Sequence, residues 1–150
     1  MTAFVTGGAG FLLAVLWFDV MFDVQVLGHG RGDVPEHVLE SISGYYRRVT
    51  TAARPMNRLI AAVMIATIVA IAAQIAGGDA PRWTGWASLA LAGSAIVLAA
   101  GRTLPSAVRL AARADTVDVQ SRLARSICRD HLVCFGAIAS VLALQLAFAR

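Results

Sequence analysis

The chain has 150 residues, of which 58% are hydrophobic and only 15% charged, whereas soluble domains carry about a quarter charged residues. The length fits one domain, and the composition excludes a protein that stays soluble on its own. The formal net charge is +4, but we expect no nucleic-acid partner, because Arg concentrated at the cytoplasmic ends of membrane helices explains the basic balance.

Four stretches contain no Asp, Glu, Lys, Arg or His, and they cover residues 1–18, 59–78, 83–101 and 132–149. Each is about long enough to cross the roughly 30 Å hydrocarbon core of a bilayer as an α-helix. One such run also fits a buried helix of a soluble protein, but a chain this short cannot bury four. We therefore expect an all-α, four-helix transmembrane bundle, a single integral membrane domain with helices at about 3–26, 56–77, 84–103 and 130–149.

The first predicted helix carries two acidic residues near its end, Asp19 and Asp23. Their spacing of four places both on one face of the helix. Asp19 falls just inside the edge of the hydrocarbon layer, where an unpaired carboxylate costs a few kcal/mol. The glycine-rich segment that follows, at 28–33, predicts a loop.

Residues 34–50 predict a short amphipathic helix that lies on the cytoplasmic face of the membrane. Its apolar positions, among them Val38, Ile42 and Tyr46, recur at helical spacing. Asp33 and Glu36 stand three apart, as in a capping box, so we expect Asp33 to cap this helix.

The connection at 79–82 is very short, so the second and third transmembrane helices are expected to be antiparallel neighbours. From 117 to 149 the helical pattern is unbroken and covers roughly 50 Å at 1.5 Å per residue. The fourth helix should therefore extend beyond the bilayer.

The distribution of Arg predicts the orientation of the bundle. The first loop with its flanks carries five Arg and the third loop carries six, whereas the second loop carries only Arg82. We expect the first and third loops to be cytoplasmic and both termini to be outside, in a bacterial inner membrane.

Several charged side chains are expected at the same depth near the cytoplasmic edge. A ligand, ion or proton site there would use Asp19, Asp23, Arg58 and His131. A purely structural layer of salt bridges between helices, which fixes the register of the bundle, is the favoured interpretation of these residues. A metal site built from Asp19, Asp23 and His131 is a weaker hypothesis, because it requires the first and fourth helices to touch. No sequence motif identifies a cofactor or an enzyme class.

A second group of candidates is the set of Arg side chains on the cytoplasmic face. Two stand in the amphipathic helix and three at spacings of three and four along the fourth helix: Arg47, Arg48, Arg122, Arg125 and Arg129. They fit a solvated, positively charged helix surface. They also fit binding of anionic lipid headgroups or of an acidic partner.

The segments 16–25 (LWFDVMFDVQ), 45–51 (YYRRVTT) and 121–131 (SRLARSICRDH) give the chain a family resemblance. It resembles a group of uncharacterised bacterial four-helix membrane proteins over most of its length. The resemblance implies the membrane bundle and no activity.

Three classes of function follow from these features. The first, which the sequence favours, is an accessory or scaffold protein that binds anionic lipid or a larger membrane partner through the Arg-rich face. The second is a small oligomeric transporter coupled to ions or protons, which uses Asp19 and Asp23. The third is a membrane enzyme with a polar site at the cytoplasmic mouth. The expected partners are membrane lipids, with a larger membrane complex or a homo-oligomer as further possibilities.

Overall fold

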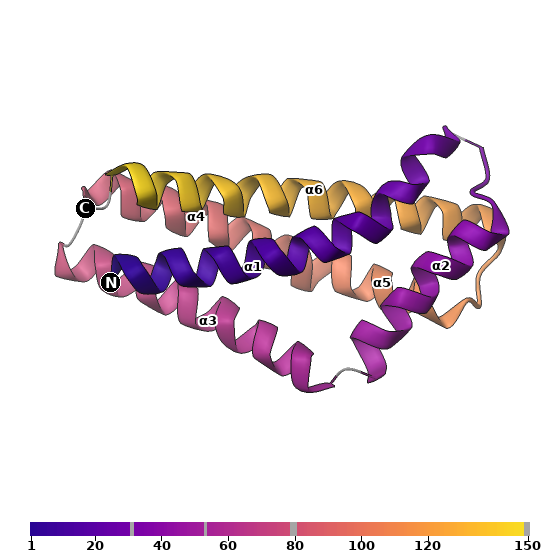
Figure 1. The fold of residues 1–150 in the computed structure, drawn as a ribbon, viewed down its shortest axis with the longest axis horizontal. Helices are drawn as coiled ribbons and strands as arrows, with labels where there is room; N and C mark the ends of the chain where they lie inside the picture. The colour runs from indigo at the N-terminus through magenta and orange to yellow at the C-terminus, as the bar shows by residue number, and fades with distance from the viewer. Residues whose placement is uncertain (31, 53, 79–80, 149–150) are drawn as a thin grey trace.

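The computed structural model describes residues 1–30, 32–52, 54–78 and 81–148 and confirms the all-α prediction, because these residues form helices and no strand. Four helices are long: α1 (Thr2–Asp23), α3 (Arg54–Gly77), α4 (Arg82–Leu98) and α6 (Val117–Phe148). Two short helices, α2 (Glu36–Arg47) and α5 (Leu104–Ala112), lie at one end of the molecule (Figure 1).

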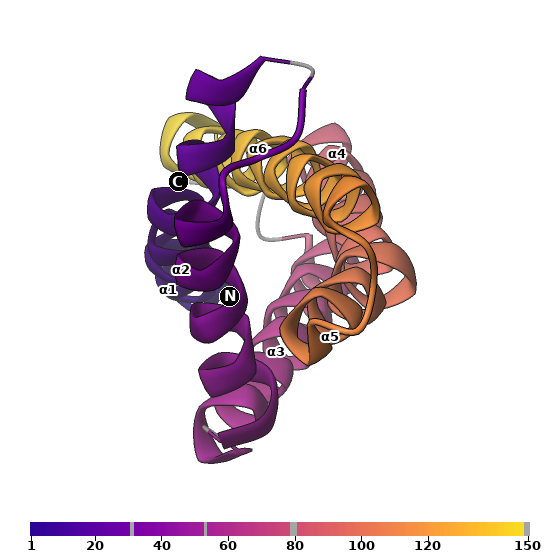
Figure 2. The ribbon, with the colours of Figure 1, turned by 90° about the vertical axis from the view of Figure 1, so that its right-hand side faces the viewer.

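The four long helices form the predicted bundle. Helix α6 packs against α1 and α4, and α3 closes the other side by packing against the same two helices. Viewed along the long axis, they surround a common core (Figure 2). Small side chains and medium aliphatic ones fill that core, including Ala9, Ala92, Ile71, Ile138 and Val141.

The outer face of the bundle is apolar. Large hydrophobic side chains are exposed on every long helix, for example Phe4 (73%), Ile65 (66%), Val97 (72%) and Leu146 (61%). Each of the four helical stretches Thr2–His29, Pro55–Gly77, Arg82–Ala112 and Val117–Phe148 is long and apolar enough to cross a membrane. Large exposed apolar surfaces need to be covered by lipid or by another protein. The apolar outer face is therefore that of a multi-pass membrane protein.

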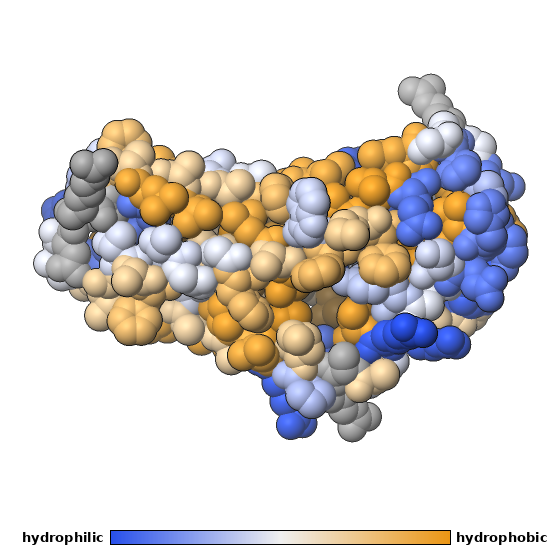
Figure 3. Space-filling model, in the orientation of Figure 1, coloured by the Kyte–Doolittle hydropathy of each residue, from blue (hydrophilic) through white to orange (hydrophobic). Residues whose placement is uncertain are grey.

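One end of the bundle differs from this pattern. It holds α2, α5 and the first half of α6, and we call it the α2 end. Hydrophilic residues gather there, whereas orange and pale residues dominate the long face of the bundle (Figure 3). Helix α6 has 32 residues, about 48 Å at 1.5 Å per residue, so the prediction of an extended fourth helix is confirmed.

The apolar side of α2 does not face lipid, contrary to the prediction that this helix lies on the membrane surface. Its buried Leu39 and Ile42 pack in a second hydrophobic core with Leu110 of α5 and Ile127 of α6. The apolar stripe was correctly identified, but the stripe itself does not distinguish a lipid surface from two other helices. The α2 end is therefore a small packed unit of its own.

Two predicted helix boundaries also need correction. Asp33 does not cap α2: the N-cap is Pro35, whose carbonyl accepts from the backbone of Val38 and Leu39. The first helix does not give way to a loop at residue 28, because the 3-10 helix η1 (Val24–His29) extends it to His29.

Two π-helical turns join the remaining elements: η2 (Arg48–Ala52) follows α2, and η3 (Ala99–Thr103) links α4 to α5. Pro105 stands in the first turn of α5, just after η3. A proline ring inside a regular helix clashes with the carbonyl four residues before it. The wider π turn relieves that clash, so α4, η3 and α5 run as one continuous helical stretch.

Candidate functional site

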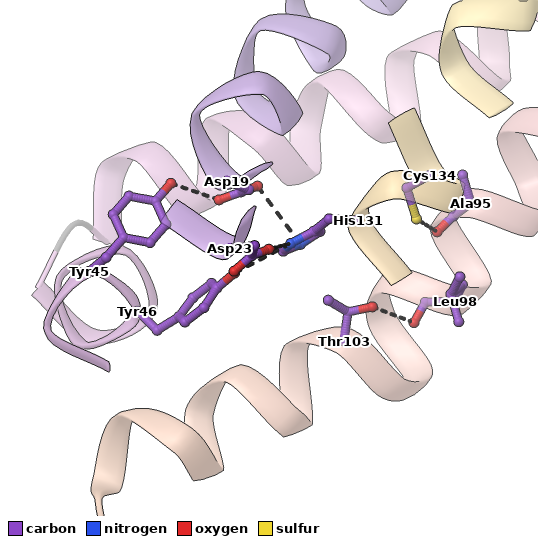
Figure 4. Close-up of polar contacts among 9 residues, drawn as sticks. All are labelled: Asp19, Asp23, Tyr45, Tyr46, Ala95, Leu98, Thr103, His131 and Cys134. Carbon is purple, nitrogen blue, oxygen red and sulfur yellow. Dashed lines mark hydrogen bonds and ion pairs between the residues drawn. The ribbon is translucent and has the colours of Figure 1, made fainter. Parts of the chain in front are cut away.

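A cluster of acidic, phenolic and imidazole side chains joins three helices where the bundle meets the α2 end. Its members, which we call the acid–base cluster, come from α1, α2 and α6: Asp19, Asp23, Tyr45, Tyr46 and His131 (Figure 4). The structure thus brings together three of the four residues predicted for a ligand, ion or proton site.

His131 lies between the two carboxyl groups. Its Nδ1 is 2.6 Å from Oδ2 of Asp23, and its Nε2 is 3.9 Å from Oδ2 of Asp19. An ionised carboxylate only accepts hydrogen bonds, so Nδ1 carries a proton in the contact with Asp23. The other ring nitrogen then faces Asp19. Each nitrogen of one imidazole therefore addresses a different carboxyl group.

The two carboxyl groups differ in their access to solvent. The side chain of Asp23 is fully buried, whereas that of Asp19 is 16% exposed. The hydroxyl of Tyr46 donates to Asp23 at 2.5 Å and also lies 3.3 Å from Nδ1 of His131. The hydroxyl of Tyr45 donates to Asp19 at 2.7 Å. Every acid in the cluster is thus held by one phenol of α2.

Burial and the neighbouring acids perturb both phenols. Loss of hydration raises the pKa of Tyr45 above its usual value of 10, and the negative charge of Asp19 raises it further. Burial also raises the pKa of Tyr46, with the charge of Asp23 as the next largest cause. Both residues remain neutral hydrogen-bond donors over the whole physiological pH range.

The local sequence explains why these groups meet. Asp19 and Asp23 lie one turn apart on α1, so both point to the same side. Tyr45 is anchored beside them because its ring stacks on Phe22, with the ring centres 4.2 Å apart. Tyr46 is 2% exposed and belongs to the core of the α2 end. The packing of α2 therefore places both phenols at the acidic face of α1.

A third buried acid lies beside the cluster. Asp130, preceding His131 on α6, is 4% exposed in its side chain and has Nε of Arg102 at 3.1 Å from Oδ2. The contact is an ion pair by distance, although Oδ2 accepts no hydrogen bond among the described residues. Arg102 instead donates to Ser126 at 2.7 Å. Because Asp130 is paired with Arg102, His131 is available to interact with Asp19 and Asp23.

The fourth predicted site residue, Arg58, does not join the cluster. It is exposed near the start of α3 and has no ion pair or hydrogen bond among the described residues. The sequence placed it at the right depth, but depth does not fix the direction in which a side chain leaves its helix. We therefore remove Arg58 from the candidate site.

The proposed metal site gains no support. Among the described residues, no three or more His, Cys, Asp and Glu side chains are arranged to hold a metal ion. One ring nitrogen of His131 is already engaged by Asp23, and Nε2 is left as its free donor atom.

The Arg side chains of the second candidate group have different environments. Arg47 and Arg48 are exposed, and they have no acidic partner within the described residues. Arg122 forms an ion pair with Asp118 one turn earlier on α6. Arg125 donates to the backbone carbonyl of Gly32. Arg129 lies 3.9 Å from its neighbour Asp130, between Nε and Oδ1, and approaches no other acid of the described residues.

Sequence reasoning missed Tyr45 and Tyr46 as site residues. A signal for Tyr46 was present, because it lies four residues after Ile42 on the apolar stripe of α2. A phenol on a buried stripe needs a hydrogen-bond partner, and the acids of α1 supply it.

Comparison with protein families, with curated proteins and with solved structures finds no match. The resemblance to bacterial four-helix membrane proteins therefore stays a prediction.

Proposed function

We propose that this protein is a membrane transporter that moves protons down their electrochemical gradient, and that the acid–base cluster takes up and releases the proton. The supporting observation is the position of His131 between one partly exposed and one fully buried carboxyl group. An imidazole can accept a proton at one nitrogen while it releases another from the opposite nitrogen. In this chain such a transfer links Asp19 to Asp23.

The transfer is balanced in protons and charge. Protonated Asp19 first closes the 3.9 Å gap to Nε2 of His131 and gives its proton to that nitrogen. The proton on Nδ1 then passes to Asp23. The products are an Asp19 carboxylate, a neutral Asp23 carboxyl and a neutral imidazole with its proton on Nε2. The reverse transfer restores the starting state. Tyr46 keeps its own proton throughout and holds Asp23 in place by donating to it.

The charge of the cluster supports proton binding over a purely structural salt bridge. Two acids share one base, since Arg102 is paired with Asp130. Even with His131 protonated, one negative charge remains uncompensated among largely buried groups, and a buried unpaired charge is costly. Uptake of one proton by the cluster removes that cost.

The bundle is closed on the far side of the cluster. The apolar core that contains Leu12, Ala95 and Ile138 fills the bundle beyond it. We therefore expect Asp19 to exchange protons with the α2 end only, as alternating access requires of a carrier at rest. The proposal includes the predicted orientation, with the α2 end in the cytoplasm of a bacterial cell and both termini outside. Reporter fusions at either terminus test that orientation.

The enzyme hypothesis has less support. One surface groove runs between α1 and α3 and another between η1 and α6. Neither is lined by a residue of the acid–base cluster, whereas a membrane enzyme at this site needs room for a substrate beside Asp19 and His131.

The test is proton flux in liposomes that contain the purified protein and a pH-sensitive dye. A potassium gradient with valinomycin sets an inside-negative potential, which should drive proton entry with the parent protein. Asp19→Asn and His131→Gln should abolish the entry. Asp118→Asn is the matched control, because Asp118 is an exposed acid of α6 paired with Arg122. A parent protein without flux above empty liposomes, or unchanged flux in Asp19→Asn, refutes the proposal.

The accessory role remains a second candidate because of the exposed cations. Arg47, Arg48 and Arg58 have no acidic partner within the described residues, and Met56 (49% exposed) and Leu59 (47%) stand beside Arg58. Cations next to exposed apolar groups suit a membrane surface with anionic headgroups. Sedimentation with vesicles of defined charge separates this role from transport, since it does not require Asp19.

A further inference from the structure

The groove between η1 and α6 combines cations with apolar walls. It encloses about 310 Å³ and is lined by Val26, Leu27 and Gly30 on one side and by Arg125, Cys128, Arg129 and Leu132 on the other. Apolar residues make up most of this lining, and its two charges are both positive. No residue of the acid–base cluster takes part in it.

The residues of α6 that line this groove change from charged to apolar where the helix is expected to enter the membrane. Arg125 and Arg129 are four apart, and Leu132 follows three residues later, so all three share one face. The uncharged stretch of α6 begins at Leu132, which is 44% exposed. The two guanidinium groups therefore stand just above the hydrocarbon edge, and the apolar face starts directly below them.

Within the part of the chain that the structure describes, no acid is fully available to neutralise the two cations of the groove. Arg125 has the backbone carbonyl of Gly32 as its hydrogen-bond acceptor, and no carboxylate of the described residues pairs with it. Arg129 has Asp130 at 3.9 Å, but Asp130 is closer to Arg102, at 3.1 Å. The side chain of Arg129 is 66% exposed, so it is free to meet an anion from outside.

The opposite wall extends the apolar part. Leu27 of η1 is 63% exposed although it lines the groove, and Val24 one turn earlier is 39% exposed. Exposed apolar side chains at the hydrocarbon edge are covered by acyl chains in a membrane. The groove thus offers a guanidinium pair for an anionic group and an apolar track for a chain attached to it.

We infer that this groove is a binding site for one anionic phospholipid, whose phosphate lies between Arg125 and Arg129 and whose acyl chain runs along Leu27 and Leu132. Guanidinium groups bind phosphate through paired, charge-assisted hydrogen bonds. The inference does not depend on proton transport. It adds to the second candidate function, binding of anionic lipid, a defined site that is separate from Arg47, Arg48 and Arg58.

The experiment is native mass spectrometry of the protein in mild detergent with added phosphatidylglycerol or phosphatidylcholine, read as the fraction that retains one lipid. Phosphatidylglycerol should be retained and phosphatidylcholine should not. Each cation near a membrane surface contributes a factor of about five in lipid affinity. We therefore expect Arg129→Gln to weaken retention of phosphatidylglycerol about fivefold and the double variant with Arg125→Gln about 25-fold.

The matched control is Arg122→Gln, which removes the same charge one turn earlier on α6. Arg122 is already paired with Asp118 and does not line the groove, so retention should stay as in the parent. An equal loss in Arg122→Gln and Arg129→Gln would mean diffuse attraction and overturn the site. Equal retention of both lipids would overturn it as well, together with the second candidate function.

Two further arms test the acyl chain and the source of the phosphate. Leu132→Asn keeps every charge and should lower retention of phosphatidylglycerol, because it places an amide on the apolar track. Soluble glycerol phosphate, added at the lipid's concentration, should not displace the lipid. Full displacement by glycerol phosphate would show that the groove binds the phosphate alone, and the lipid assignment would then be wrong.

Discussion

Replacing Tyr46 with Phe removes a single hydroxyl group from the acid–base cluster and leaves the aromatic ring in the core of the α2 end. That hydroxyl donates to Asp23 at 2.5 Å, and the Asp23 side chain has no exposed surface. Water cannot replace the lost donor. A hydrogen bond to a charged group contributes about 1.5–3 kcal/mol, so we expect Tyr46→Phe to lower the free energy of unfolding by about 2 kcal/mol.

The matched variant is Tyr45→Phe, which makes the same chemical change one residue earlier. Its partner Asp19 keeps 16% of its side chain exposed, so water can satisfy the carboxylate. The expected cost is about 0.5–1 kcal/mol. Both values can be measured from SDS-induced unfolding in mixed micelles, followed by far-UV circular dichroism. Equal costs for the two variants, or no cost for Tyr46→Phe, would refute the burial argument.

A double-mutant cycle separates the hydrogen bond from the packing of the ring. If Tyr46 stabilises the fold through Asp23, then Tyr46→Phe should cost little once Asp23→Ala has removed the acceptor of its hydrogen bond. Groups in direct contact typically show coupling of about 0.5–3 kcal/mol. Strict additivity of the two variants would place the effect of Tyr46 in its ring contacts instead.

Two further outcomes follow from the structure. Burial and the nearby acids raise the pKa of Tyr45 and Tyr46, which are the two tyrosines of the chain. Because neither phenol should ionise in the folded protein, the absorbance of tyrosinate at 295 nm should stay flat through pH 10. A raised pKa in the folded state means that the stabilisation is complete below pH 10 and is lost above it, so the absorbance should appear together with alkaline unfolding. A Cβ added at Gly8 would lie 2.1 Å from Oγ1 of Thr67, whereas one added at Gly7 would meet nothing within 4 Å. Gly8→Ala should therefore lower the free energy of unfolding in SDS by about 1–3 kcal/mol, and Gly7→Ala should leave it unchanged.

The sequence was sufficient to predict the four long helices. Uncharged runs such as 59–78 and 132–149 are long enough to cross a bilayer, and nothing in the chain competes with that signal. Helix ends were predicted less well. The prediction that Asp33 caps α2 was wrong because Pro35, two residues later, already supplies the φ angle and the free carbonyl that begin a helix.

The acid–base cluster was predictable in part. Asp19, Asp23 and His131 were placed at one depth by their distance from the uncharged runs, and α1 and α6 do pack together. Depth along a helix follows from counting residues, but the direction around its axis depends on which helices are neighbours. The prediction that Arg58 belongs to the site was wrong for that reason. Tyr45 was missed because α2 was expected to face lipid and not the acids of α1.

A pair of buried glutamines at the opposite end of the bundle could not be predicted from the sequence for the same reason. Gln74 of α3 and Gln145 of α6 stand inside uncharged runs, where the sequence gives no reason to pair them. Their amides donate to each other at 3.0 and 3.1 Å. The remaining N–H of Gln74 meets Thr2, and that of Gln145 meets Ser88. Both side chains are 1% exposed, so an unpaired amide there would be costly.

The two polar layers of the bundle therefore differ in kind. In the glutamine layer every amide N–H has an acceptor and every group is neutral, so the layer can hold α3 and α6 in register without any change of state. In the acid–base cluster Asp19 and Asp23 share the single base His131, so one negative charge remains uncompensated even when His131 is protonated. A layer whose only role was to join helices would be expected to resemble the first. The unequal number of acids and bases in the second is what favours proton exchange at that end of the molecule.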